Sequence, residues 1–284
     1  MSGASGFVGT YLKTAFAEQG WTVSALGRDA FRSAEALQEK MTAANVVVNL
    51  AGAPIMARWS DSYKKELYAS RVDTTRALVC ALSRLKDRPR LFISTSAIGI
   101  YPPNIPCDES VTRLADDFLG RLAHDWEREA TRAAEIGVRT VIFRFGVILG
   151  RGGGALAQML TPFRLGLGGV IGDGTQPFSW VHIDDLGAAF FFVMNHETCS
   201  GVYNLTAPHP VSNKVFTKAL GSALHRPTIF PVPAFVLKMK FGEGADVLIK
   251  GQHVLPRRLL ESGFKFRYLR IDEALKNLLA ERQG

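Results

Sequence analysis

Three glycines near the N-terminus carry the clearest chemical signal in the chain. Gly3, Gly6 and Gly9 have the spacing G-x-x-G-x-x-G, and apolar residues at helical spacing follow them. In such a turn the first glycine lets the chain bend sharply, the second lets the backbone approach a pyrophosphate, and the third lets the helix pack closely on a sheet. The helix N-terminus offers free N–H groups and a partial positive charge. The spacing therefore predicts a turn that binds the pyrophosphate of a dinucleotide.

A second signal lies at Gly27 and Arg28, where the next strand is expected to end. About 20 residues after the glycine turn, an NAD-binding protein usually places Asp or Glu against the ribose 2′-hydroxyl. Glycine leaves room there for a 2′-phosphate, and a guanidinium can donate two parallel hydrogen bonds to it. We therefore expect NADP(H) rather than NAD(H). The alternative is that Arg28 is a solvated surface residue.

The elements that must position these residues alternate along the first half of the chain. Apolar runs predict strands at 21–26, 45–50, 90–94 and 139–144, and amphipathic runs predict helices at 9–19, 34–41, 61–86 and 115–136. Strands alternating with helices favour an α/β fold with a Rossmann-type, doubly wound parallel sheet. Only Met1 and Ser2 precede Gly3, so we expect the strand that normally feeds such a turn to lie upstream of residue 1 or to have been lost.

The alternation ends near residue 150. Glycine-rich segments follow at 150–154 and 166–174, and prolines punctuate the chain from Pro208 onward. We therefore assign 1–150, plus parts of 175–205, to an NADP-binding Rossmann domain. Residues 151–174 and 206–284 are assigned to a smaller, mostly helical C-terminal lobe that carries the substrate side of the cleft.

Composition excludes several classes of protein. No apolar run is long enough to span a membrane, and the basic residues behind the net charge of +8 are scattered, which argues against a nucleic-acid partner. Cys80, Cys107 and Cys199 form neither a C-x-x-C pair nor a Cys/His cluster, so we expect no disulfide framework and no metal site. A reducing cytoplasm is the expected location.

Several motifs together resemble a known superfamily. The glycine turn, Asn49-Leu-Ala-Gly52, the segment 94–101 and the segment 180–186 look like the extended short-chain dehydrogenase/reductases. The segments at 58–59, 70–75, 150–156 and 162–169 resemble more particularly the SDR39U1-like epimerase family proteins, a sugar nucleotide epimerase-like subgroup with an extra C-terminal domain. The resemblance covers essentially the whole chain.

The resemblance implies a set of cofactor-binding positions. Arg71 stands where many relatives have Asn and could reach a phosphate or a ribose, and Glu66, just over one helical turn earlier, either orients Arg71 or is a surface charge. Ile148 matches a loop near the nicotinamide, and Leu50 and Ala51 match positions that line the adenosine. The full set is Gly3, Gly6, Phe7, Val8, Gly27, Arg28, Leu50, Ala51, Glu66, Arg71 and Ile148.

The usual catalytic pair of the superfamily is missing. Its chemistry rests on Tyr-x-x-x-Lys, with Tyr as the acid/base and Lys lowering the pKa of that Tyr. If Glu127 matches the Glu that follows the Lys in relatives, the two positions are occupied by Leu119 and Ala123, and no Tyr occurs within 102–202. Neither side chain can transfer a proton.

Three other residues are left as catalytic candidates. Ser96 matches the Ser/Thr that fixes the reacting oxygen, and Tyr101 is the nearest phenol, although packing beside Pro102 and Pro103 is the alternative reading. His182 could shuttle protons near neutral pH or serve as a structural hydrogen-bond partner. The adjoining Asp184 and Asp185 are expected to cap a helix.

Two functions stay open at this point. The first is an NADP(H)-dependent oxidoreductase or epimerase-like protein that acts on an unknown small molecule by an atypical proton path. The second is a non-catalytic NADP(H)-binding sensor or interaction protein, which the missing Tyr/Lys pair favours. Arg58, Trp59 and Gln176 are candidates for substrate contact, and a homodimer is the expected assembly if the chain behaves like extended relatives.

Overall fold

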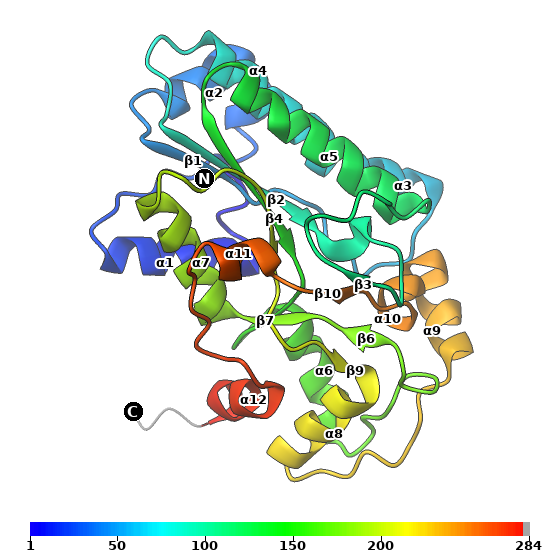
Figure 1. Cartoon of the computed structure of the whole chain (residues 1–284). Coiled ribbons are helices and arrows are strands. Elements are labelled where there is room, and N and C mark those ends of the chain that lie inside the picture. Colours follow the sequence, from blue (N-terminus) through cyan, green and yellow to red (C-terminus); the bar gives the residue numbers. More distant parts are fainter. Residues whose placement is uncertain (281–284) are drawn as a thin grey trace.

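The centre of the molecule is a parallel β-sheet, as the sequence predicted. The computed structural model describes residues 1–280, and its main sheet has the strand order β1-β2-β4-β8, with all neighbours parallel. These strands are β1 (Val46–Asn49), β2 (Leu91–Ala97), β4 (Arg139–Phe145) and β8 (Gly201–Leu205). The expected Rossmann-type fold, with a mostly helical C-terminal region, is confirmed (Figure 1).

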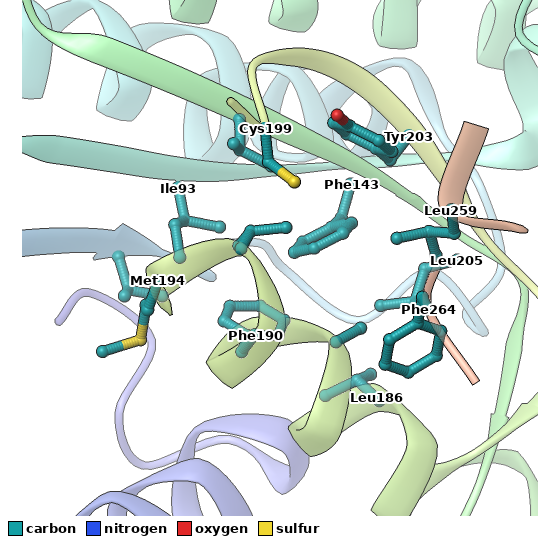
Figure 2. Packing of buried hydrophobic residues seen from close by; sticks show 14 of the residues in the cluster. Ile93, Phe143, Leu186, Phe190, Met194, Cys199, Tyr203, Leu205, Leu259 and Phe264 are labelled. Carbon is teal, nitrogen blue, oxygen red and sulfur yellow. The ribbon is translucent and has the colours of Figure 1, made fainter. Parts of the chain in front are cut away.

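Helices cover both faces of this sheet. Alternate residues of each buried strand point to opposite faces, so Ile93 and Phe143 pack on one side and Phe92 and Ile142 on the other. Helices α1 (Phe7–Glu18) and α7 (Ile183–Asn195) cover the first face, where Phe190 packs on Phe143 (Figure 2). Helices α2 (Ala34–Met41), α4 (Thr74–Arg84) and α5 (Phe118–Glu135) cover the second.

The remainder of the chain is built from short strands and helices. Three two-stranded pairs join distant segments: β5 (Val147–Leu149) with β7 (Trp180–His182), β6 (Pro177–Phe178) with β9 (Val211–Ser212), and β3 (Pro106–Cys107) with β10 (His253–Val254). The helices are α6 (Gly154–Arg164), α8 (Asn213–Ala223), α9 (Ala234–Phe241), α10 (Asp246–Ile249), α11 (Arg257–Glu261) and α12 (Ile271–Leu279). Short 3-10 turns lie at η1 (Ala30–Arg32), η3 (Ile98–Ile100) and η4 (Gly242–Ala245). The domain borders given above stay a prediction.

The structure corrects two expected elements. Residues 21–25 form no strand, and only Leu26 makes a β-bridge, because the partner beside them is limited to Met1 and Ser2. Ser2 bridges Leu26 on one side and Asn49 on the other, so it lies between these two segments. The expected single helix at 61–86 is three segments: α3 (Asp61–Tyr68), a π-helical turn η2 (Ala69–Asp73) and α4.

Two searches of the described residues bear on the excluded classes. No helix within residues 1–280 is both long and apolar enough to cross a bilayer. In the same residues, no group of three or more His, Cys, Asp or Glu side chains is placed to hold a metal ion.

Candidate functional site

The glycine turn has the geometry that its spacing predicted. Gly3 adopts φ +64°, and a Cβ at this residue would lie 2.5 Å from the Leu50 carbonyl oxygen. A Cβ at Gly9 would overlap the carbonyl oxygen of Gly3, so the helix could not approach the turn. The Gly6 N–H donates to the Gly3 oxygen at 3.1 Å, which closes the turn. Steric limits therefore require glycine at positions 3 and 9.

The helix that leaves this turn presents free backbone donors. Gly6 is the N-cap of α1 in an extended conformation and offers no side-chain acceptor, and no acidic residue lies in the first turn. Within residues 1–280, the N–H groups of Phe7, Val8 and Gly9 donate no hydrogen bond, while the N–H of Thr10 already pairs with Gly6. Three free N–H groups and the positive end of the helix dipole together form an anion site.

The ring of Phe7 brings a second glycine-rich segment to this turn. A Cβ at Gly150 would lie 2.6 Å from the Phe7 ring, one at Gly154 would lie 2.8 Å from it, and one at Gly153 would overlap it. The loop 150–154 therefore rests directly on the pyrophosphate turn. Ile148 lies just before this loop in β5 and packs against the main core. The sequence marked both segments as glycine-rich, but nothing in it indicated that they touch.

Arg71 is a half-buried cation that no carboxylate neutralises within the described residues. Its guanidinium donates to the carbonyl oxygens of Ala53 at 2.9 Å and Leu67 at 3.3 Å, and it lies over the ring of Trp126. A Cβ at Gly52 would touch it at 3.0 Å, so this glycine leaves room for the guanidinium. Burial lowers the pKa of Arg71 to about 10. A bound anion would restore the favourable solvation that burial removes.

The expected partner of Arg71 does not reach it. Glu66 is exposed on α3, and its carboxylate forms no ion pair or hydrogen bond within residues 1–280. Arg71 lies within the π-helical turn η2, and its guanidinium donates to Ala53 rather than to Glu66. The geometry therefore favours the surface reading of Glu66.

The other positions expected to bind the cofactor lie at the rim of the same turn. Leu50 and Ala51 are half-buried after β1, and the Leu50 N–H points at Ser2. Gly27 and Arg28 are exposed, and Arg28 makes no ion pair within residues 1–280, whereas the adjacent Asp29 pairs with Lys40 at 2.5 Å. Arg28 is thus available to an outside anion.

Ser96 and Tyr101, expected as catalytic, lie in a buried ion-pair network. The Ser96 hydroxyl donates to Glu127 Oε1 at 2.6 Å, and Arg144 donates to both oxygens of Glu127 at 2.7 Å. Arg144 also donates to the Tyr101 hydroxyl at 2.6 Å, and that hydroxyl donates to Asn204 at 3.0 Å. Burial raises the pKa of Tyr101 to about 12, the charge of Arg144 only partly opposing it. This geometry argues against either residue as a proton-transfer group.

The two positions that the resemblance assigns to the Tyr/Lys pair, Leu119 and Ala123, lie in apolar surroundings. The Cβ of Leu119 lies 3.4 Å from the place that a Cβ at Gly99 would take, beside the end of β2. Ala123 packs in a small core with Ile98, Ile100 and Tyr101.

His182 caps a helix in the structure. Its Nδ1 accepts the N–H of Asp184 at 3.1 Å, its Nε2 lies 3.2 Å from Asn277, and its ring stacks on Tyr268 at 3.8 Å between centroids. The side chain is 1% exposed, and burial lowers its pKa. These contacts favour the structural reading and leave no open face for a proton shuttle.

Asp185 does not cap the helix, contrary to expectation. Its two carboxylate oxygens accept the N–H groups of Arg267 at 2.7 Å and Tyr268 at 3.0 Å, and thus hold the C-terminal segment. Asp184 instead accepts from the Tyr11 hydroxyl at 3.1 Å. No local sequence pattern indicates this contact, because 82 residues separate Asp185 from Arg267.

The three candidates for substrate contact each have a protein partner. Arg58 donates to the Met239 carbonyl at 3.2 Å, Trp59 donates to Ile55 at 3.0 Å, and Gln176 donates to Ile171 at 3.1 Å. The first of these joins the two halves of the chain, whereas the third is a local contact five residues apart. Their role towards a substrate stays a prediction.

Comparisons with known proteins agree with this geometry. Residues 1–206 match the NAD dependent epimerase/dehydratase family, and residues 232–278 match a domain of unknown function, DUF1731. The epimerase family protein YfhF of Bacillus subtilis is 35% identical over 299 aligned residues, which cover 100% of this chain and 98% of that protein. The epimerase family protein SDR39U1 of Mus musculus is 37% identical, with 99% of each chain covered.

A solved structure of a relative bears on the cofactor. Human epimerase family protein SDR39U1 (isoform 2), solved with NADPH, superposes with a TM-score of 0.90 at 34% identity, covering 98% of this chain and 97% of that one. The UDP-glucuronic acid 4-epimerase of Bacillus cereus, solved with NAD, has a TM-score of 0.79 at 15% identity over 98% and 96% of the two chains, which shows a shared fold.

Proposed function

Because the chain belongs to the NAD dependent epimerase/dehydratase family, we propose that it binds NADP(H) and is an oxidoreductase or epimerase-like protein acting on a small molecule. The observation that carries the proposal is the set of anion-seeking groups around one turn. Free N–H groups at Phe7 and Val8, the half-buried cation of Arg71 and the exposed cation of Arg28 have no carboxylate partner within residues 1–280. The relative solved with NADPH supports the same cofactor.

The residues present fit such a cofactor. Gly3, Gly6, Phe7 and Val8 would hold the pyrophosphate, since a Cβ at Gly3 would fill the space that the turn keeps open. Arg28, beside Gly27, would hold a 2′-phosphate, which a carboxylate at this place would repel. Ile148, Leu50 and Ala51 supply half-buried apolar surface along the remainder of the site. When bound, NADP(H) would supply hydride transfer.

The protein itself contributes no proton-transfer group at the usual place. Leu119 and Ala123 carry no ionisable atom, and Ser96 and Tyr101 are committed to Glu127 and Arg144. We therefore propose that proton exchange, where the reaction needs it, uses the substrate or solvent. The alternative, a non-catalytic sensor, is tested by a turnover assay.

Cofactor titration tests the first half of the proposal. The dissociation constants of NADPH and NADH are measured by quenching of tryptophan fluorescence, for the wild type and for Arg28→Ala. One charge-assisted bidentate pair gives a preference for NADPH of about 10- to 100-fold, which Arg28→Ala should abolish. Arg32→Ala is the matched control, because this arginine is also exposed and lies one helical turn away. Equal wild-type affinities would contradict the assignment of Arg28.

A turnover assay tests the second half. Oxidation of bound NADPH is followed against a panel of carbonyl compounds, and epimerisation against a panel of nucleotide sugars. Turnover that survives Tyr101→Phe supports an atypical proton path. Tight NADPH binding without any turnover supports the sensor.

The setting and assembly belong to the same proposal. Cys107 and Cys199 are free and buried, and Cys80 is free and exposed, which supports a reducing compartment. We propose a cytoplasmic protein whose partner is a small molecule and neither a nucleic acid nor a membrane. A homodimer is the proposed assembly, which light scattering would measure directly.

A further inference from the structure

A carboxylate lies where the proposed cofactor would place its ribose 2′ group. Gly27 follows Leu26, which forms a β-bridge with Ser2 beside the glycine turn. A Cβ at Gly27 would lie 2.6 Å from Asp29 Oδ1, so this oxygen stands directly against the glycine. A carboxylate in this place accepts a hydrogen bond from a 2′-hydroxyl and repels a 2′-phosphate. Asp29 therefore bears on the choice between NAD(H) and NADP(H).

The backbone around Asp29 fixes this arrangement. The Ala30 N–H donates to the Gly27 carbonyl oxygen at 3.0 Å, which closes a tight turn. Ala30 is fully buried, in the same cluster as Leu37 and Met41 of α2. The turn is thus anchored in the core that it shares with α2, and the exposed Asp29 side chain is left outside this core, next to Gly27.

Lys40 is the partner of this carboxylate. It precedes Met41 on α2, and its Nζ lies 2.5 Å from Asp29 Oδ2, the carboxylate oxygen farther from Gly27. Within residues 1–280, no second side chain donates a hydrogen bond to Asp29. The hydrogen bond from Lys40 holds the pKa of Asp29 below its ordinary value, so the carboxylate is ionised at neutral pH. The exposed fractions are 43% for Lys40 and 54% for Asp29, so the pair adds little to the stability of the fold.

The charges around Gly27 bear directly on which cofactor this place accepts. Arg28, Asp29 and Lys40 together carry one net positive charge. Without Lys40, the carboxylate of Asp29 would cancel the charge of Arg28. A phosphate monoester carries nearly two negative charges at neutral pH, whereas a 2′-hydroxyl carries none. A unit charge about 5 Å from such a dianion changes its affinity in water by roughly 10-fold. Loss of Lys40 would therefore penalise NADP(H) and not NAD(H).

We propose that Asp29 and Lys40 act together to set the preference between NADP(H) and NAD(H). Asp29 is the acceptor that a 2′-hydroxyl uses. Lys40 is a positioning residue, which neutralises Asp29 and thereby allows a 2′-phosphate to bind beside Arg28. The inference rests on the proposed function, since it concerns the same cofactor at the same turn.

The test measures the dissociation constants of NADPH and NADH by calorimetric titration of the full chain. Lys40→Met is expected to weaken NADPH binding by about 10-fold and to leave NADH binding within about 2-fold. Asp29→Asn is expected to weaken NADH binding by about 10-fold without weakening NADPH binding, because the 2′-hydroxyl loses an ionised acceptor. The double variant, Asp29→Asn with Lys40→Met, is expected to recover the wild-type affinity for NADPH to within about 3-fold.

Two controls separate the effect of charge from an effect on folding. Lys40→Arg keeps the ion pair and should keep the ratio of the two affinities. Lys218→Met removes an exposed lysine of α8 that forms no ion pair within residues 1–280, and it should leave the ratio unchanged as well. Sodium chloride at about 1 M is expected to reduce the effect of Lys40→Met to about 2-fold or less, because salt screens exposed charges. A structural defect would persist at high salt.

Three outcomes would overturn the inference. An unchanged ratio of affinities in Lys40→Met, with wild-type binding intact, would refute it and leave the proposed function standing. Weak NADPH binding that persists in the double variant would make Lys40 a direct ligand of the phosphate rather than a positioning residue. Binding of neither dinucleotide to the wild type would refute the proposed function and this inference together.

Discussion

The buried pair of Glu127 and Arg144 offers the most direct test of the site geometry. Both side chains are nearly enclosed, with exposed fractions of 10% and 9%, and Glu127 accepts three hydrogen bonds from Arg144 and Ser96. Glu127→Gln keeps the size of the side chain and removes its charge. One oxygen then becomes an NH2 group, which must face either the guanidinium or the Ser96 hydroxyl.

The expected cost follows from what is left behind. Arg144 would stay buried without a counter-charge, and removing one member of a buried pair costs about 3–5 kcal/mol. In a chain of this size, that loss corresponds to a fall in Tm of roughly 5–8 °C. Burial lowers the pKa of Arg144, but Glu127 and Tyr101 outweigh this effect and raise it. The raised pKa reflects the same interaction between Arg144 and Glu127.

Urea unfolding followed by circular dichroism measures this loss, and Glu129→Gln is the control. Glu129 lies on the same helix and is 7% exposed, but its partners Arg76 and Arg132 are 46% and 53% exposed and can return to solvent. We expect the control to lose no more than about 1 kcal/mol. Equal losses for the two variants would refute the view that Glu127 is the hub of a closed network.

Three further predictions concern the turn and its surroundings. Arg71→Ala is expected to weaken NADPH binding by about 10- to 100-fold while leaving Tm unchanged or higher, because it removes a half-buried cation that no carboxylate neutralises; calorimetric titration and a thermal melt measure the two effects. Gly9→Ala is expected to weaken NADPH binding by at least about 100-fold, whereas Gly20→Ala, which meets no atom within 4 Å, should leave the affinity unchanged. The Met1 amine has its pKa lowered from 8.0 to about 6, so the unfolded chain binds its proton more tightly, and stability present above pH 8 is lost as the pH falls to 6. The free energy of unfolding in urea is measured at pH 8.5 and at pH 5.5, for the chain with a free N-terminus and for the acetylated chain. Between these two pH values the free chain should lose about 2–3 kcal/mol more than the acetylated chain.

Three of the four strands of the main sheet could be predicted because each contains a short apolar run, whereas β8, which contains Asn204, was not predicted. Val47 and Val48, Leu91 to Ile93, and Val141 to Phe143 are buried in the structure. The segment 21–26 has the same kind of sequence and is no strand. Its ladder depends on a neighbour, and a local pattern carries no information about whether the neighbour is present.

The shape of the glycine turn could be predicted for a related reason. Gly3, Gly6 and Gly9 act through the backbone geometry of one turn, which their spacing alone determines. The residues expected to be catalytic depend instead on distant partners: Tyr101 bonds to a residue 103 positions away, and His182 to one 95 positions away. A side chain that could transfer a proton in isolation becomes structural once such partners occupy its lone pairs. The spacing of residues along the sequence does not predict those distant partners.

The same partners show why the C-terminal region belongs to the frame of the nucleotide site. Asp185 and His182 hold the segment around Tyr268, and Arg151 donates to the Ala280 carbonyl at 2.6 Å, at the end of α12. Arg151 stands in the same loop whose glycines rest on Phe7. The loop 150–154 is therefore fixed from one side by the C-terminal helix and from the other by the glycine turn. A side chain at Gly150, Gly153 or Gly154 would collide with the Phe7 ring, so these glycines allow the close contact between the loop and the turn.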